Sequence, residues 1–294
     1  MAEVEEIVIK IMKVLILGAK GNLGSQLVRV FGSEAIAWDR EDLDITSREE
    51  VAAKISGLKP EVIVNAIAYN AVDKCEESES ENALAKKLNG EAVGYLAEAA
   101  LATNAVFIHY STDYVFSGEN VGGYNEDAKP GPINNYGKSK LFGEEILHTK
   151  SVQGLRYYLI RTSKLFGPKG ASEFSKSSFF DTMFNLAKTK EKLKVVDAEF
   201  SCFTYTVDLA QRTKELLEKE YPFGVYHLVN GGPATWYGAA AQLFKIAGIR
   251  VKLIAVGSEE FPRPAKRPKS SVLLNTKTSP LRNLSEALAE YLNL

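Results

Sequence analysis

A short apolar run over residues 14–17 stops at a glycine and leads through a glycine-rich turn into a helical pattern. The turn reads Gly18-Ala-Lys-Gly21-Asn-Leu-Gly24, and apolar residues at helical spacing continue to Phe31. Glycines between a strand and a helix let backbone amides approach a pyrophosphate. The spacing GxxGxxG also occurs in ordinary tight turns, so the flanking strand and helix carry the prediction of a dinucleotide site. The residues expected to line it are Gly18, Gly21, Asn22, Leu23 and Gly24.

The alternation of strand and helix continues through the first half of the chain. Short apolar runs predict further strands at 35–38, 62–66, 106–110 and 157–161. Helical patterns cover 47–55 and 81–103, and another helix is expected to open near Tyr136. Strands that are apolar along their whole length are typical of parallel sheets covered on both faces. The expected fold class is therefore α/β, with a Rossmann-type doubly wound parallel sheet.

The rhythm breaks beyond residue 161. Residues 167–178 are rich in Gly, Pro, Lys and Ser, which predicts a lid, and an irregular stretch is expected between a helix at 179–186 and residue 208. Later elements are a sheet strand at 224–230, a helix at 236–247 and a basic, proline-rich loop at 261–268. We therefore expect a smaller C-terminal substrate-binding lobe interleaved with the sheet. The expected division is 12–164 and about 205–231 for the NAD(P)-binding domain, about 165–204 and 232–294 for the lobe, and 1–11 for an N-terminal extension.

Charge and cysteine content argue against several classes of protein. With 36 basic and 37 acidic residues, the net charge of -1 gives no electrostatic reason to bind nucleic acid or an anionic membrane. The two cysteines belong to no CxxC or Cys/His cluster, so neither a disulfide framework nor a zinc site is expected. Charged residues interrupt every apolar run, and the acidic start is unlike a signal peptide. The expectation is a cytoplasmic protein without a metal site.

An acidic residue closes the second predicted strand. Asp39 follows the glycine turn by about 20 residues, where a carboxylate accepts hydrogen bonds from the adenosine ribose hydroxyls. Arg40 comes next, and its guanidinium would pair with the 2'-phosphate of NADPH or stack on adenine. The choice between NADH and NADPH therefore stays open. Asp44 and Ile45 are expected at the adenine edge, although an exposed acid beside a core isoleucine explains that pair equally well.

A phenol and an ammonium four residues apart form the candidate acid-base pair. In Tyr136-Gly-Lys-Ser-Lys140 both side chains share one helix face, but about one such Tyr-x-x-x-Lys is expected by chance in this chain. Its position carries more weight, because it follows the strand end Ser111-Thr112-Asp113, and the carboxyl ends of strands hold the site in open α/β sheets. We expect Lys140 to lower the pKa of Tyr136. Thr112 would hold a substrate oxygen while Tyr136 donates a proton and a nicotinamide delivers hydride.

Together these motifs resemble those of the dTDP-4-dehydrorhamnose reductases, extended members of the short-chain dehydrogenase superfamily. The similarity runs nearly end to end, and several of its motifs are specific. The segments that carry it are LGAKGNLG at 17–24, LDIT at 43–46, VNAIAYNAVDKCE at 64–76, STDYVF at 111–116, YGKSK at 136–140, RTS at 161–163, VYHLVNGG at 225–232 and PRPAKRPKSS at 262–271.

The resemblance implies NAD(P)H-dependent reduction of the 4-keto group of a nucleotide-linked 6-deoxyhexose, dTDP-4-dehydrorhamnose to dTDP-L-rhamnose. Thr112, Tyr136 and Lys140 become the catalytic trio, and the last two also contact the cofactor. Further implied cofactor contacts are Asn65, Ala66 and Ala68. The implied substrate contacts are Asn70, Val72, Thr112, Asp113, Lys164 and Arg267, the last through the diphosphate, whose geometry suits a guanidinium. Such reductases are often homodimers, some with interfacial Mg²⁺, for which the sequence shows no acidic cluster.

The chain departs from the family on the substrate side. After the RTS segment the family usually has a tryptophan that packs on the sugar, whereas this chain has Lys164. Ser201 and Phe203 replace the glycine and proline of the facing loop, and Asn70 replaces a usual threonine. Either Lys164 points into the cleft and favours a substrate with an added acceptor, or it turns to solvent and Phe203 supplies the aromatic surface.

Two other functions stay open at this level. A related group includes the regulatory subunit of methionine adenosyltransferase, which keeps the dinucleotide site but serves as a partner protein. The intact Thr, Tyr and Lys trio favours an enzyme over such a module. A sugar-nucleotide epimerase or dehydratase is the third reading, although full-length epimerases normally have a larger second lobe.

Overall fold

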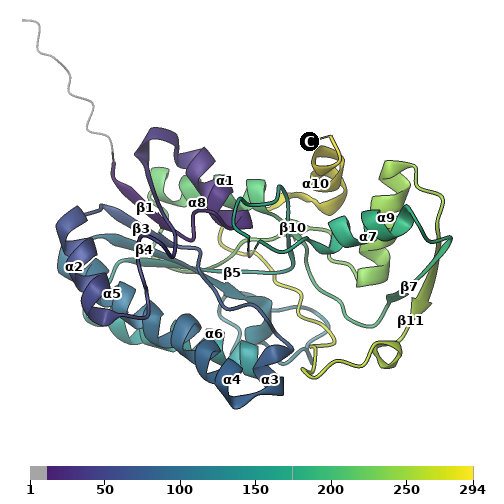
Figure 1. Cartoon of the computed structure of the whole chain (residues 1–294), viewed down its shortest axis with the longest axis horizontal. Coiled ribbons are helices and arrows are strands. Elements are labelled where there is room, and N and C mark those ends of the chain that lie inside the picture. Colours follow the sequence, from purple (N-terminus) through teal and green to yellow (C-terminus); the bar gives the residue numbers. More distant parts are fainter. Residues whose placement is uncertain (1–11, 174, 294) are drawn as a thin grey trace, which may run out of the picture.

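The computed structural model describes residues 12–173 and 175–293, so the extension expected at 1–11 lies outside the described residues. Its centre is a six-stranded sheet in the order β2-β1-β3-β4-β5-β9, with every pairing parallel (Figure 1). The strands are β1 (Val14–Leu17), β2 (Ala35–Trp38), β3 (Val62–Asn65), β4 (Val106–Thr112), β5 (Tyr157–Thr162) and β9 (Gly224–His227). The predicted doubly wound α/β sheet is confirmed. Its order reverses beside β1, where sheets of this kind open a crevice for ligands.

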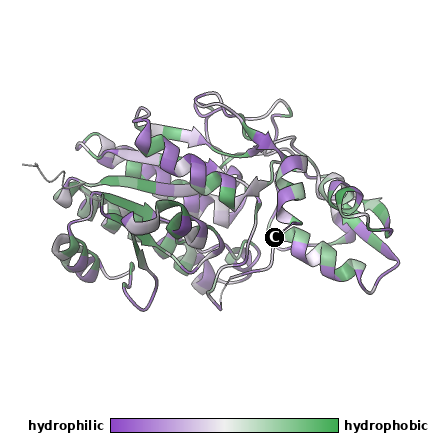
Figure 2. Ribbon diagram, turned by 90° about the horizontal axis from the view of Figure 1, so that it is seen from above, coloured by the Kyte–Doolittle hydropathy of each residue, from purple (hydrophilic) through white to green (hydrophobic). Residues whose placement is uncertain are grey.

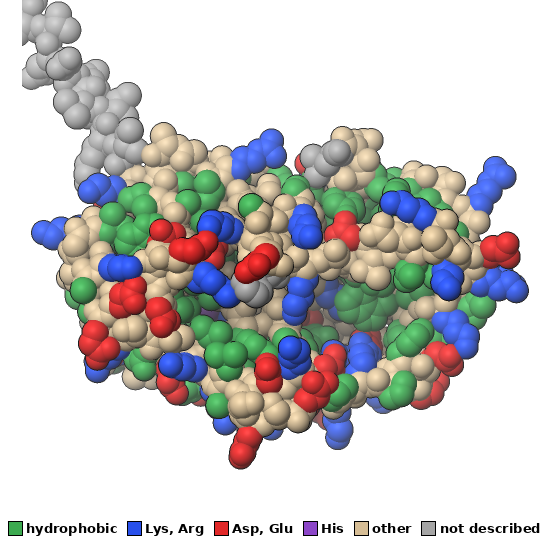
Figure 3. All heavy atoms as spheres, in the orientation of Figure 1, with side chains coloured by type: hydrophobic (Ala, Val, Ile, Leu, Met, Phe, Trp, Pro, Cys, Tyr) green, Lys and Arg blue, Asp and Glu red, His purple; other side chains and the backbone are tan. Residues whose placement is uncertain are grey.

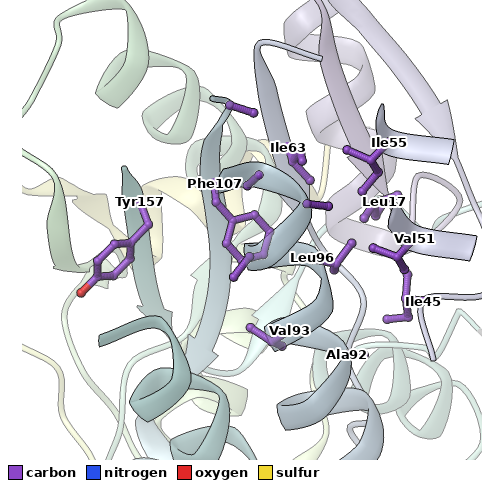
Figure 4. Packing of buried hydrophobic residues seen from close by; sticks show 14 of the residues in the cluster. Leu17, Ile45, Val51, Ile55, Ile63, Ala92, Val93, Leu96, Phe107 and Tyr157 are labelled. Atoms are coloured by element: carbon purple, nitrogen blue, oxygen red, sulfur yellow. The ribbon is translucent and has the colours of Figure 1, made fainter. Parts of the chain in front are cut away.

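Helices cover both faces of the sheet because its strands are apolar on both sides. α1 (Asn22–Phe31) and α8 (Thr206–Glu218) cover one face, and α2 (Arg48–Leu58), α5 (Ala92–Thr103) and α6 (Asn135–Ser151) cover the other (Figure 1). Alternate side chains of β1 enter the two cores, Leu15 and Leu17 on the α2 and α5 side, Val14 and Ile16 on the α1 and α8 side. Figure 4 shows the first of these cores, and Figure 2 shows the apolar strands enclosed by helices with hydrophilic outer faces.

A smaller group of elements forms a lobe beyond the sheet (Figure 1). It contains α7 (Phe179–Ala187), α9 (Trp236–Ala247), α10 (Leu284–Tyr291) and the parallel strands β7 (Lys192–Val196) and β11 (Lys252–Val256). Phe180, Phe203, Leu243 and Leu288 meet in its separate hydrophobic core. The chain leaves the sheet after β5 and returns with α8 and β9, so the lobe is interleaved with the sheet.

The prediction of an irregular stretch up to residue 208 is wrong in three places, one of which is the short strand β8 (Thr204–Tyr205). β7 lies within it, with Leu193 and Val195 buried and Lys192 and Lys194 exposed, and α8 already begins at Thr206. β7 pairs with β11, whose first residue follows 60 positions later, so the pairing is invisible to a local pattern. The single helix expected at 81–103 is also divided, into α4 (Glu79–Lys86), a π-helical turn (Lys87–Glu91) and α5.

Short strands and one buried carboxylate join the lobe to the sheet. β6 (Leu165–Phe166) pairs with β8 (Thr204–Tyr205), and β10 (Asn230–Gly231) pairs with β12 (Leu281–Asn283). Asp208 at the start of α8 accepts hydrogen bonds from Arg282 Nε at 2.9 Å and from Asn230 Nδ2 at 2.7 Å. These contacts hold the lobe beside the carboxyl ends of the sheet strands. A short helix, α3 (Lys74–Glu77), lies in the segment that follows β3.

Charged side chains of both signs are interspersed over the molecular face in Figure 3. Within residues 12–173 and 175–293, no helix has the length and apolar character needed to cross a bilayer.

Candidate active site

A cavity of about 1100 Å³ opens at the carboxyl ends of the sheet strands. The glycine turn, the ends of β2 to β5, the start of α6 and the lid around residues 172–178 line it. The predicted site residues that line this cavity are Gly18, Gly21, Asn22, Leu23, Gly24, Asp39, Arg40, Asp44, Ala66, Ala68, Asn70, Thr112, Tyr136, Lys140 and Lys164. The predicted site residues outside its lining are Ile45, Asn65, Val72, Asp113 and Arg267.

The glycine turn has the shape that a pyrophosphate site requires. Gly18 has a φ of 76°, in the left-handed region that favours glycine. A Cβ on Gly24 would overlap the Gly18 carbonyl oxygen, so helix and turn approach more closely than any side chain allows. Gly21 caps α1 without a side-chain hydrogen bond, which leaves the first-turn amides available to an anion. The turn therefore fits a dinucleotide.

The lid lies directly on this turn. Asn22 Oδ1 accepts a hydrogen bond from the Gly170 amide at 2.9 Å, and Asn22 Nδ2 donates to the Lys176 carbonyl at 3.0 Å. The Ser172 amide donates to the Lys20 carbonyl at 2.9 Å. A single asparagine of the glycine motif thus bonds both ends of a segment that lies some 150 positions further along the chain.

Asp39 ends β2 at the rim of the cavity. Its carboxylate accepts the Lys20 amide on Oδ2 and the Arg40 amide on Oδ1, both at 2.9 Å. Because a carboxylate has about four acceptor positions, capacity remains for ribose hydroxyls. Asp44 lines the same end, and hydrogen bonds from Thr46 lower the pKa of its carboxyl.

Ile45 does not reach the adenine edge. Its side chain is 3% exposed and packs beside Val51 in the core under β1 (Figure 4). The alternative of a core isoleucine next to a solvated acid is therefore the correct one for this pair. A branched apolar side chain gains more from burial in that core than from the polar rim of the cavity.

Thr112 and Tyr136 meet where β4 ends and α6 begins. The Thr112 hydroxyl donates to Asp113 Oδ1 at 3.1 Å, and it also hydrogen-bonds the Tyr136 phenol. Burial raises the pKa of Tyr136 above its ordinary value of 10, against the smaller opposing effect of that hydrogen bond. The phenol is therefore held in its protonated form, which is the form a proton donor needs.

The amine of Lys140 forms its contacts with residues of β4. Its Nζ donates to the Tyr110 carbonyl at 2.6 Å and lies 3.3 Å from His109 Nε2, so the amine is directed at β4. Burial lowers the pKa of Lys140 to about 8. Burial is the largest influence on the Tyr136 pKa and raises it, so a lowering of that pKa by Lys140 stays a prediction.

His109 is a polar group at the site that the sequence analysis missed. Asn65 Oδ1 accepts the Ile67 amide at 3.0 Å, so Asn65 Nδ2 faces His109 Nδ1 at 3.1 Å and donates to it. Burial lowers the pKa of His109, and the neutral ring then carries its proton on Nε2, facing the Lys140 amine. This arrangement favours the unprotonated amine, in line with its lowered pKa. One of only three histidines, in the middle of an apolar strand, was the available signal.

Of three other predicted substrate contacts, one lines the cavity and two lie outside its lining. Asn70 lines the cavity and accepts a hydrogen bond from Lys176 Nζ at 3.0 Å. Arg267 lies outside the lining and forms a two-pronged ion pair with Asp73 at 2.7 and 2.8 Å. Asp113 is buried beside Thr112, and burial raises the pKa of its carboxyl.

The structure distinguishes between the two alternatives for Lys164 and Phe203. Lys164 lines the cavity, with its Nζ 3.8 Å from the centre of the Trp236 ring. Phe203 is 1% exposed and packs in the core of the lobe, and Ser201 is also buried, where its backbone pairs with Ala234. The alternative in which Lys164 turns to solvent and Phe203 forms the pocket surface is therefore wrong. Among residues 12–173 and 175–293, no three His, Cys, Asp or Glu side chains cluster as metal ligands.

Comparison with known proteins places this geometry in context. The model of the RmlD substrate binding domain family matches residues 12–293. The dTDP-4-dehydrorhamnose reductase of Escherichia coli K12 is 37% identical, over 90% of each chain. The spore coat polysaccharide biosynthesis protein SpsK of Bacillus subtilis is 34% identical, over 95% of this chain and 96% of its own length.

Solved structures with the same architecture cover nearly the whole chain. A dTDP-4-dehydrorhamnose reductase from Clostridium acetobutylicum is 38% identical with a TM-score of 0.88, covering 96% of this chain and 99% of its own. The enzyme from Bacillus anthracis in complex with NADP is 32% identical with a TM-score of 0.87 and the same coverage.

Proposed function

The chain belongs to the RmlD substrate binding domain family, and on this premise we propose that it reduces the 4-keto group of dTDP-4-dehydrorhamnose with NADPH or NADH. One observation carries the proposal. The glycine turn and the trio Thr112, Tyr136 and Lys140 line a single cavity at the carboxyl ends of the strands. A dinucleotide on the turn and a carbonyl at the trio would thus share one cavity.

The chemistry assigned to the chain's own residues is proton donation and orientation. A bound nicotinamide dinucleotide supplies the hydride. Tyr136, kept protonated by burial, donates its proton to the carbonyl oxygen, and the Thr112 hydroxyl orients that oxygen. Lys140, with a pKa near 8, exchanges protons close to neutral pH and lies on the same helix as the phenol. Two hydrogen bonds with Asn22 hold the lid against the turn.

The nucleotide end of the substrate would meet the basic loop after β11. Arg267 is held by Asp73 and faces the segment that follows β3. We assign its guanidinium to the diphosphate, with Asn70 at the sugar. The proposal also includes a cytoplasmic homodimer, and sedimentation of the purified protein tests the dimer.

The test is an NAD(P)H-oxidation assay with the purified chain. Oxidation of NADPH or NADH that equals the dTDP-4-dehydrorhamnose added, with dTDP-L-rhamnose as product, supports the proposal. dTDP-L-rhamnose as the added compound is the control, because it has no keto group to reduce. Tight dinucleotide binding without turnover of any 4-keto sugar nucleotide would instead support a regulatory protein.

A further inference from the structure

Lys164 has a backbone conformation that its side chain does not favour. Its φ is 40°, in the left-handed region, at the junction between β5 and β6. The other non-glycine residues of positive φ in the described part of the chain are Lys59, Asn104 and Glu220, which lie at or just after helix ends. Lys164 has no such role, and it lines the cavity. Strain of this kind persists where surrounding structure imposes it, often at ligand sites.

The surroundings that impose this conformation are well defined. The Lys164 carbonyl accepts the Thr204 amide at 3.2 Å, beside the pairing of β6 with β8. Its Nζ lies over Trp236 at 3.8 Å and over Phe203 at 5.0 Å from the ring centres, a cation–π arrangement. Both rings are fixed, Phe203 by the core of the lobe and Trp236 by donation to Glu199 Oε2 at 2.9 Å. The ammonium is therefore held in one place.

This ammonium lacks oxygen acceptors. Within residues 12–173 and 175–293, no hydrogen bond from Lys164 Nζ is formed, although the group has three donors. Burial lowers its pKa to about 7, and the Asp113 carboxylate opposes that shift. Because Lys164 lines the cavity and its amine has no oxygen acceptor, the amine is suited to bind an oxygen of the ligand.

The neighbouring charges indicate whether the ligand oxygen that Lys164 binds is charged or neutral. Asp113 offsets the charge of Lys164, while Arg263 pairs with Glu199 and Arg267 pairs with Asp73. No net positive charge is left to hold a carboxylate at this position. An amine donates hydrogen bonds in its charged and neutral forms alike, so a neutral sugar hydroxyl is the matching acceptor.

We propose that Lys164 selects the sugar by donating a hydrogen bond to a ring hydroxyl next to the reacting carbonyl. The position follows from its neighbour Asp113, which directly follows Thr112 in the chain. In a 4-keto hexose the ring hydroxyl next to the carbonyl is the C3 hydroxyl. The preferred substrates are therefore nucleotide-linked 4-keto sugars that keep the C3 hydroxyl, in preference to their 3-deoxy counterparts. This inference rests on the proposed function and adds the feature of the sugar that is recognised.

A cycle of protein variants and substrate analogues tests the proposal. The kcat and KM of the full chain and of Lys164→Met are measured with dTDP-4-dehydrorhamnose and with its 2-deoxy and 3-deoxy forms. The unaltered chain should lose roughly 10- to 100-fold in kcat/KM when the contacted hydroxyl is removed, as expected for a hydrogen bond to a charged group. With the complete sugar, the kcat/KM of Lys164→Met should be lower than that of the unaltered chain by the same factor. Removal of the contacted hydroxyl should then lower the kcat/KM of this variant little further. Removal of the other hydroxyl should change kcat/KM by the same factor in the unaltered chain and in Lys164→Met.

The matched control is Lys188→Met, because Lys188 also lies over an aromatic ring, Phe184, but outside the cavity. It should keep the discrimination of the unaltered chain. If Lys164→Met discriminates between sugar and analogues as the unaltered chain does, the proposal is wrong. Lys164→Gln, which keeps a donor, should recover part of the loss and serves as the second variant if the first does not fold. An unaltered chain that is inactive with the complete sugar overturns the proposed function instead.

Discussion

The glycine turn and the sugar end of the same cavity are built in opposite ways. Around the turn, the strand, the turn and the helix come from one continuous segment, residues 14–31. At the sugar end, Lys164, Phe203 and Trp236 come from three segments up to 72 residues apart. The first kind of site is specified by local spacing and backbone geometry. The second depends on how the lobe packs, so it can change without disturbing cofactor binding.

The largest effect is expected for Tyr136→Phe, which removes the phenol oxygen from the catalytic part of the cavity but leaves the glycine turn unchanged. Turnover should fall by ~10² to 10⁴, the usual contribution of a positioned proton donor, while cofactor affinity stays nearly unchanged. Single-turnover kinetics and NADPH titration measure the two effects. Tyr95→Phe, on α5, is the control. Near-normal turnover in Tyr136→Phe would mean that another group donates the proton.

Phe203→Ala should destabilise the lobe without emptying the cofactor site. The ring is 1% exposed among Phe179, Phe180 and Trp236, so its removal should cost about 3–5 kcal/mol in the free energy of unfolding. Urea denaturation measures the cost, and dinucleotide titration of the folded variant tests the separation of the two regions. Phe184→Ala, with a side chain 36% exposed on α7, should cost far less. An equal cost in both would remove Phe203 from the core.

Gly24→Ala tests the glycine turn, where we expect weaker dinucleotide binding. The added Cβ would overlap the Gly18 carbonyl oxygen, and overpacking of this kind costs about 1–3 kcal/mol. If the turn is displaced at that cost when the dinucleotide binds, its affinity should fall roughly 5- to 150-fold. Gly57→Ala is the control, because a Cβ at this position in α2 meets nothing within 4 Å and should stabilise the helix slightly. Unchanged affinity in Gly24→Ala would show that the close approach of turn and helix is unnecessary.

Asp39→Ala has the smallest expected effect and separates the two cofactors. Both should bind more weakly, because the carboxylate also accepts the Lys20 and Arg40 amides. NADH should lose about tenfold more than NADPH, whose 2'-phosphate replaces a hydroxyl that the carboxylate would accept from. Dissociation constants for both cofactors measure the difference. Equal losses would remove Asp39 from the ribose.

The sequence predictions succeeded for features that depend on nearby residues and failed for features that depend on distant ones. β1 and α9 have the bounds that their apolar patterns predict, since periodicity depends on nearby residues. β7 was missed because its partner β11 lies far along the chain. Tyr136 and Lys140 share a helix as their spacing requires, but that spacing did not reveal the partners of the amine. A spacing of four residues places the two side chains on the same helix face. The hydrogen-bond partners of the Lys140 amine, however, come from β4.

The sequence by itself determined the parallel sheet, the glycine turn and the helix that presents Tyr136, because each depends on local periodicity or on the absence of a side chain. Only the tertiary structure decided the protonation of the phenol, the hydrogen bonds of the lid to Asn22 and the cavity position of Lys164. The physical reason is that burial and partner choice are set by segments far apart in the sequence. No local pattern contains the desolvation or the distant hydrogen-bond partners that fix them.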